Sequence, residues 1–213
     1  MTESLLHPLS RRHAIVGAGA VVLSGCGTVL QGPPVPQLYV LRPQVPATMG
    51  PRVNWRLAVA SPDAVASLDT PRIALMRSAT TMDYFANAAW TDRVTLILQR
   101  QLIQAFDTSG RITSVDRDTS GLEADFVLQT EIRDFQARYD TPDGAPQIVV
   151  SIQAKLARMP QRDIATSVNA TQQATAGANE INSIVVAFNQ ATGAAIAQIV
   201  TGTLGMPQPG AAG

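Results

Sequence analysis

Three runs of alternating hydrophobic and polar residues occupy the second half of the chain. The first run spans residues 124–133, the second 148–156 and the third 164–170. In the first run, one side carries Ala124, Phe126, Leu128, Thr130 and Ile132, and the other carries Asp125, Gln129, Glu131 and Arg133. A two-residue period indicates a strand with one buried face. Turn residues separate the runs at 142–144 and 159–162, so the pattern predicts an antiparallel meander.

Two other segments have the three-to-four-residue period of an amphipathic helix. The first spans about Ala88–Asp107, and its apolar positions are Trp90, Val94, Ile97, Leu98, Leu102, Ala105 and Phe106. The second spans about Asn179–Thr203, and its apolar positions are Ile181, Ile184, Phe188, Ala191, Ala195 and Ile199. We expect the side chain of Asn179 to cap this second helix, with Glu180 in its first turn.

Shorter apolar runs lie in the first half of the chain. They predict strands at 39–41, 56–60 and 112–115, and a hairpin formed by 72–76 and 82–85. The expected fold class is α+β: a mainly antiparallel sheet, with its meander after a central helix, covered on one face by the two helices. We expect a single domain over residues 37–205, followed by a flexible tail at 206–213.

The amino-terminal segment has the features of an export signal. Residues 1–13 form a basic leader with Arg11 and Arg12, and residues 14–23 are apolar and mostly small. Ser24-Gly25 then precedes Cys26, the only cysteine of the chain. Ten apolar residues are too few to span a bilayer as a helix. With cysteine directly after the cleavage point, the segment resembles a bacterial lipoprotein lipobox, and this implies a mature chain that carries lipid on Cys26.

This resemblance divides the amino-terminal region into a signal peptide at 1–25 and a proline-rich tether at 26–36. The alternatives are an ordinary signal peptide followed by a free thiol, or a buried cysteine in a cytosolic domain. Gly27 stands where an aspartate would favour retention in the inner membrane, so the outer membrane is favoured. The paired arginines leave both the general and the twin-arginine export routes open.

Charge and histidine content exclude several function classes. Without residues 1–25, the chain has 188 residues with 15 acidic and 14 basic side chains, a net charge of −1. Such a chain has no long-range attraction for nucleic acid. Both histidines, His7 and His13, lie in the leader. This excludes Ser–His and Cys–His catalysis, His or Cys zinc sites and haem or iron–sulfur ligation from the mature chain, so we expect no enzyme, metal or cofactor. A hydrolase that uses only carboxylates remains an alternative.

No charged residue follows Glu180 in the chain. A membrane-spanning interpretation of the last helix fails because Asn182, Asn189, Gln190 and Gln198 interrupt its apolar runs. Its uncharged polar face suggests contact with a partner or with a second copy of the chain. The alternative is a helix buried in its own fold.

Several segments, in order along the chain, resemble the auxiliary lipoproteins of bacterial ABC-type lipid transport systems, the PqiC-like family. They are Cys26 with its tether, Tyr39-Val-Leu41, Trp55–Pro62, Leu68–Ile73, Met82–Phe85, Trp90–Arg93 and Val186–Gln190. The resemblance implies an accessory subunit beside an ABC permease, its ATPase and an MCE-type substrate-binding protein. Such assemblies move phospholipid between the inner and outer membranes. The lipoprotein would face the periplasm and dock the transporter at the outer membrane.

The resemblance supplies no catalytic residues. Met82, Tyr84 and Phe85 are candidate partner-binding residues, because they lie near the predicted hairpin end; the alternative is that they pack on their own core. The competing function is a structural or assembly lipoprotein of the cell envelope.

Overall fold

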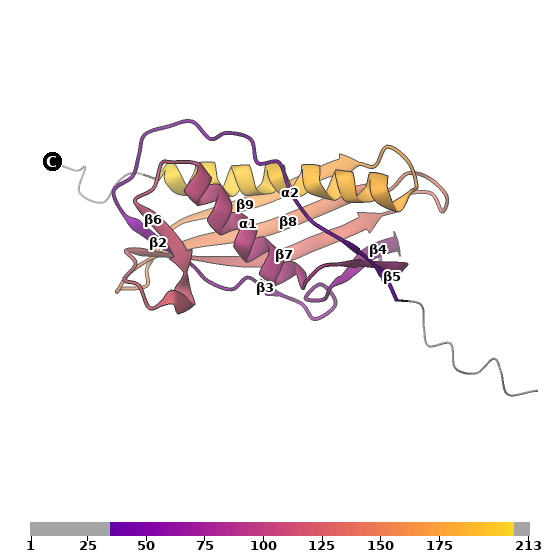
Figure 1. The fold of residues 1–213 in the computed structure, drawn as a ribbon, viewed down its shortest axis with the longest axis horizontal. Helices are drawn as coiled ribbons and strands as arrows, with labels where there is room; N and C mark the ends of the chain where they lie inside the picture. The colour runs from indigo at the N-terminus through magenta and orange to yellow at the C-terminus, as the bar shows by residue number, and fades with distance from the viewer. Residues whose placement is uncertain (1–34, 207–213) are drawn as a thin grey trace, which may run out of the picture. The chain divides into compact units, whose positions relative to one another are not determined.

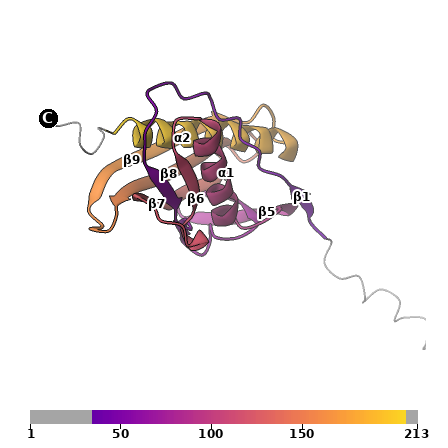
Figure 2. The ribbon, with the colours of Figure 1, turned by 60° about the vertical axis from the view of Figure 1, so that its left-hand side comes forward.

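The computed structural model describes residues 35–206, and the fold belongs to the compact unit that begins at Pro36 (Figures 1 and 2). Cys26, the predicted signal peptide and the tail after Met206 lie outside the described residues. The strands and helices are β1 (Gln37–Tyr39), β2 (Arg56–Val59), β3 (Asp63–Ala64), β4 (Arg72–Ser78), β5 (Thr81–Trp90), α1 (Val94–Thr108), β6 (Ser114–Arg117), β7 (Phe126–Arg138), β8 (Gln147–Arg158), β9 (Ile164–Thr175) and α2 (Ile181–Leu204). A 3-10 turn lies at Asp118–Ser120.

The predicted α+β class and meander are confirmed. Strand β7 pairs antiparallel with β8 from Phe126–Arg158 to Arg138–Gln147, and β8 pairs antiparallel with β9. These are the longest strands of the nine-stranded sheet. Their alternation produces one buried face, on which Leu128, Ile152 and Ala170 are at most 1% exposed.

The short strands of the first half pair differently. Strands β2, β3 and β4 follow one another along the other edge of β7, each parallel to it. Strands β1 and β6 extend the sheet in parallel beside β5 and β2, and β4 and β5 form the predicted antiparallel hairpin. The alternating pattern did not predict these parallel pairings. The path of the connection between two strands sets whether they run parallel or antiparallel, and the side-chain period is the same in both cases.

Both helices cover the same face of the sheet, as expected (Figure 1). Helix α2 packs along β8 and β9, and α1 packs beside it over β2 and β6. An aromatic cluster joins the layers: Trp90 of β5, Phe135 of β7 and Phe188 of α2 are all at most 2% exposed. The Phe188 ring lies 5.2 Å from that of Trp90 and 5.1 Å from that of Phe135.

The predicted start of the first helix was wrong. Residues 88–90 belong to β5, and α1 begins at Val94. The spacing of Trp90 and Val94 fits a helix, but pairing with β1 occupies this backbone. The backbone N–H of Trp90 donates to the Pro71 carbonyl oxygen at 2.6 Å, and that of Thr91 donates to Tyr39. Sheet pairing therefore overrides the local periodicity.

The predicted cap of the last helix was also wrong. Glu180 occupies the N-cap position, and no side chain caps the helix. The Asn179 side chain instead accepts a hydrogen bond from the Tyr139 hydroxyl at 2.7 Å and donates to the Asp143 carbonyl oxygen at 3.4 Å. It therefore ties the start of α2 to the β7–β8 turn. The first strand is shifted as well: β1 covers 37–39, and Leu41 follows it as a buried residue.

An ion pair connects β2 to the start of β7. The Arg56 guanidinium donates to both carboxylate oxygens of Asp125 at 3.2 Å, and the Arg56 backbone N–H donates to Asp125 at 2.7 Å. The hydrogen bond from the Arg56 side chain is the main cause that lowers the pKa of Asp125, and partial burial opposes it. Both side chains are about two-fifths exposed, so solvent screens the pair and its contribution to stability is small.

We expect Asp125→Asn to lower the free energy of unfolding at pH 7 by about 1 kcal/mol. A carboxylate whose pKa is lowered on folding stabilises the fold above its unfolded pKa of about 4, and this stabilisation is lost as the pH falls through the lowered pKa. The difference between wild type and variant should therefore vanish in strong acid. Urea unfolding across this pH range measures the difference in unfolding free energy, and Asp143→Asn, at an exposed site, is the control. A difference that does not change with pH would contradict the stabilising role of the Arg56–Asp125 ion pair.

Candidate functional site

An extended segment crosses over the helices between β1 and β2 (Figures 1 and 2). We call residues 40–53 the strap; they contain Pro43, Pro46 and Pro51 and form no helix or strand. Proline removes a backbone donor and fixes φ, so this composition resists regular pairing. The strap reaches β2 by passing along α2 and not through the sheet.

Contacts at both ends and in the middle hold the strap. Leu41 and Val53 are 3% and 2% exposed, so each end is anchored in the core. The Arg42 backbone N–H donates to the Asn189 side chain of α2 at 2.6 Å. The guanidinium of the buried Arg111 donates from Nε to the Pro51 carbonyl oxygen at 3.2 Å.

The strap backbone also approaches α2 closely at Gly193. A Cβ placed on Gly193 would overlap the Gln44 carbonyl oxygen and lie 3.4 Å from the Gln44 backbone nitrogen. Glycine lowers helix stability, by about 1 kcal/mol relative to alanine. Its presence inside α2 is explained by this contact, which seats the strap directly on the helix backbone.

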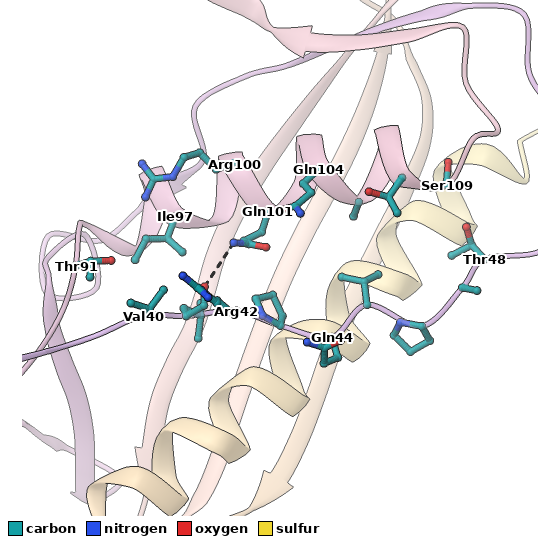
Figure 3. Close-up of a pocket in the computed structure, with 17 residues that line it drawn as sticks. Val40, Arg42, Gln44, Thr48, Thr91, Ile97, Arg100, Gln101, Gln104 and Ser109 are labelled. Atoms are coloured by element: carbon teal, nitrogen blue, oxygen red, sulfur yellow. Dashed lines mark hydrogen bonds between the residues drawn. The ribbon is translucent and has the colours of Figure 1, made fainter.

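A groove of about 740 Å³ lies between the strap and α1 (Figure 3). Its volume is typical of ligand-binding sites. The lining consists of strap residues 40–48, Thr91, and one side of α1 with its C-terminus: Ile97, Arg100, Gln101, Gln104, Ala105, Thr108 and Ser109. A second hollow, of about 490 Å³, lies between strap residues 46–48 and the α2–β9 side, so the strap separates two cavities.

The charge of the groove has one sign. Its two charged lining residues are Arg42 and Arg100, and no acidic residue lines it. Arg100 forms an ion pair at 3.0 Å with Asp92, outside the lining, and its hydrogen bond is the main cause that lowers the pKa of Asp92. Within residues 35–206, the Arg42 guanidinium has no ion-pair partner. Figure 3 shows Arg42 and Arg100 toward the same end of the groove.

The remaining polar lining consists of amides and hydroxyls. Gln101 and Gln104 lie along α1, and the Gln101 amide donates to the Leu41 carbonyl oxygen at 3.5 Å. Hydroxyl groups without a base beside them are not activated nucleophiles. The lining contains no histidine, cysteine or carboxylate, so this arrangement is suited to binding and not to acid–base catalysis.

The predicted partner-binding residues lie elsewhere. Met82, Tyr84 and Phe85 are half-buried on β5 and pack against the core. The Tyr84 hydroxyl donates to Ser67 at 3.0 Å, and the Arg72 guanidinium lies 3.7 Å from the Tyr84 ring centre. The three residues share one hairpin and do not line the groove, so their role in partner binding stays a prediction. Cys26, the other predicted site, lies outside the described residues.

Sequence reasoning did not find the groove. The strap has no regular apolar period, and Arg100 and Gln104 lie among the polar positions of α1, so neither segment marks a groove in the sequence. The one local signal was Gly193 within an apolar helix, a position where glycine implies close approach of another backbone.

A second surface is nearly free of charge. From Ile164 to Met206 the one charged residue is Glu180, and β9 pairs only with β8, which leaves its outer edge open among the described strands. Helix α2 is long and apolar enough to cross a membrane by composition, but 61% of its most apolar window is buried within the fold. Its exposed positions include Val186, 66% exposed, and Gln190. Depletion of charge on an exposed edge is typical of an interface.

Comparisons with known proteins agree with this fold and with the lipoprotein pattern. The sequence model of the family described as "ABC-type transport auxiliary lipoprotein component" matches residues 39–200. A crystal structure of a DUF330 protein from Xanthomonas campestris is 26% identical, with a TM-score of 0.72 over 79% of this chain and 94% of that one. A crystal structure of an uncharacterised protein is 16% identical, with a TM-score of 0.62 over 78% and 97% of the two chains, and shares the fold.

No curated protein matches the sequence at a significant level. The family match covers well over half of the chain, including α1, most of α2 and nearly the whole sheet. The chain belongs to the family of ABC-type transport auxiliary lipoprotein components.

Proposed function

We propose that the protein is a lipid-anchored, non-catalytic accessory subunit of an ABC/MCE-type system that moves phospholipid between membranes. In this role it faces the periplasm, is held at the outer membrane through lipid on Cys26, and docks the transporter there. The observation that carries the proposal is the family match over residues 39–200 together with a lipobox-like segment that ends at Cys26.

Three features of the chain support this role. The family is an auxiliary component of transport and not itself a permease or an ATPase. The chain contains no histidine after His13, and the groove lining contains no general acid or base. The uncharged β9–α2 surface supports association with a partner or a second copy of the chain.

Co-purification tests the proposal. We expect the full chain, isolated in mild detergent after brief crosslinking in its own cells, to carry an MCE-type protein and the ABC permease and ATPase. A lipoprotein of similar abundance, tagged in the same way, is the control for envelope background. Recovery of assembly-machine subunits in place of these partners would support the structural-lipoprotein alternative, and recovery of the chain alone would contradict both.

A further inference from the structure

We infer that the groove between the strap and α1 binds an extended protein segment that carries an acidic side chain at one end. The segment belongs to another envelope protein. This inference names the docking surface of the proposed accessory role and rests on that role. Three properties of the groove carry it: its charge, the free backbone groups of the strap and the amides along α1.

The charge of the lining selects an anion at one end. Arg42 and Arg100 lie toward the same end, and the lining offers no competing carboxylate (Figure 3). Asp92 already neutralises part of the charge of Arg100, so Arg42 is the main attraction. Arginine binds a carboxylate with two parallel hydrogen bonds, so an Asp or Glu side chain of the segment fits this end.

The strap offers backbone groups for pairing. Among the described residues, the backbone N–H groups of Gln44, Val45, Ala47 and Thr48 have no hydrogen-bond partner. The Gln44 carbonyl oxygen lies against Gly193, so this residue packs on α2. Val45, the next residue, lines the groove, and its backbone N–H is one of the unpaired groups. An incoming extended segment can pair with the strap there, as in other cases of strand addition.

The opposite wall favours a peptide over a lipid. Gln101, Gln104 and Thr108 follow one another along α1 at three- and four-residue spacing. Each glutamine amide can both donate to and accept from a peptide backbone. A hydrocarbon chain in the groove would bury the same amides without partners, which is unfavourable. The polar groups of this wall are therefore matched to a polypeptide backbone.

Photocrosslinking at the groove wall tests this inference. The benzophenone amino acid p-benzoylphenylalanine replaces the exposed Gln104 in the full chain, and cells are irradiated. We expect an adduct with a different protein, mapped by mass spectrometry to a segment that contains Asp or Glu. The same probe at Gln129, exposed on β7, is the matched control and should not give this adduct.

Charge reversal at Arg42 makes the test specific. We expect Arg42→Glu to reduce the Gln104 adduct roughly tenfold, because it places like charges together. Arg42→Lys, which keeps the charge, should retain a large part of it. Arg117→Glu, at an exposed site on β6 that does not line the groove, should leave the adduct unchanged. Because Arg42 is also exposed, these substitutions should not alter folding, and a thermal melt checks this.

The outcomes separate the inference from the proposed function. An adduct with lipid or with a second copy of the chain, no adduct, or an adduct unaffected by Arg42→Glu would overturn the groove assignment. If the MCE-type partner still co-purifies in those cases, the accessory role stands. An Arg42-dependent adduct with an acidic segment of a protein outside any transport system would support the groove and overturn the role.

Discussion

Replacing Phe188 by alanine should lower the free energy of unfolding by about 3–5 kcal/mol. Phe188 is completely buried, and its ring contacts Trp90 edge-on and Phe135 at 5.1 Å. These three rings belong to α2, β5 and β7, so the substitution opens a cavity where the helix layer meets the sheet. Loss of two aromatic contacts adds to the loss of buried area. Since domains are typically stable by about 5–15 kcal/mol, much of the stability would disappear.

Urea unfolding of the full chain measures this effect. Val186→Ala is the matched control, because Val186 lies two residues earlier in α2 and is 66% exposed. We expect the control to change the unfolding free energy by about 0.5 kcal/mol or less. If Phe188→Ala lowered the free energy of unfolding by less than about 1 kcal/mol, the aromatic cluster would not hold the helix layer to the sheet.

Replacing Cys26 by serine should abolish lipid attachment. On the proposed maturation, the native protein begins at Cys26 and carries acyl chains on its sulfur and its amino group. Each buried methylene contributes about 0.8 kcal/mol to membrane binding, and two or more chains hold a protein firmly. A serine hydroxyl cannot replace the thiol, so intact-mass spectrometry should find no lipid on the variant. The fold should be unaffected, because the compact unit begins at Pro36.

Ser24→Ala is the control for Cys26→Ser, since it keeps a small residue before the cleavage point and should preserve lipid attachment. An unmodified Cys26 thiol in the native protein would remove the anchor from the proposed function. The family assignment would remain, because it rests on residues 39–200.

The hydrophobic pattern of the sequence was sufficient to predict those helices and strands whose form depends on neighbouring residues in the chain. The alternation from 124 to 170 predicted the meander because each of these strands has one buried face, which fixes its side-chain period. The apolar spacing of α2 predicted that helix to within two residues at its start. The pattern gave the wrong element at Ala88–Trp90. These small and aromatic residues fit both the helical and the strand period, and hydrogen bonding to β1 makes them a strand.

The candidate site could not be predicted in the same way. Its residues come from the strap and from the polar side of α1, which are about 50 residues apart in sequence. Neither segment has a pattern that refers to the other. Tertiary contacts place the strap beside α1: Gln44 lies against Gly193, the Gln101 amide donates to the Leu41 carbonyl oxygen, and Leu41 and Val53 are buried in the core.

The sequence by itself determined the fold class, the meander, the two helices, the lipobox resemblance and the lack of histidine chemistry after His13. Each of these depends on residues close together in the chain or on composition alone. The tertiary structure decided the parallel pairing along β7, the true start of α1 and the groove beside the strap. These depend on which distant backbone groups meet, and hydrophobic periodicity carries no information about that choice.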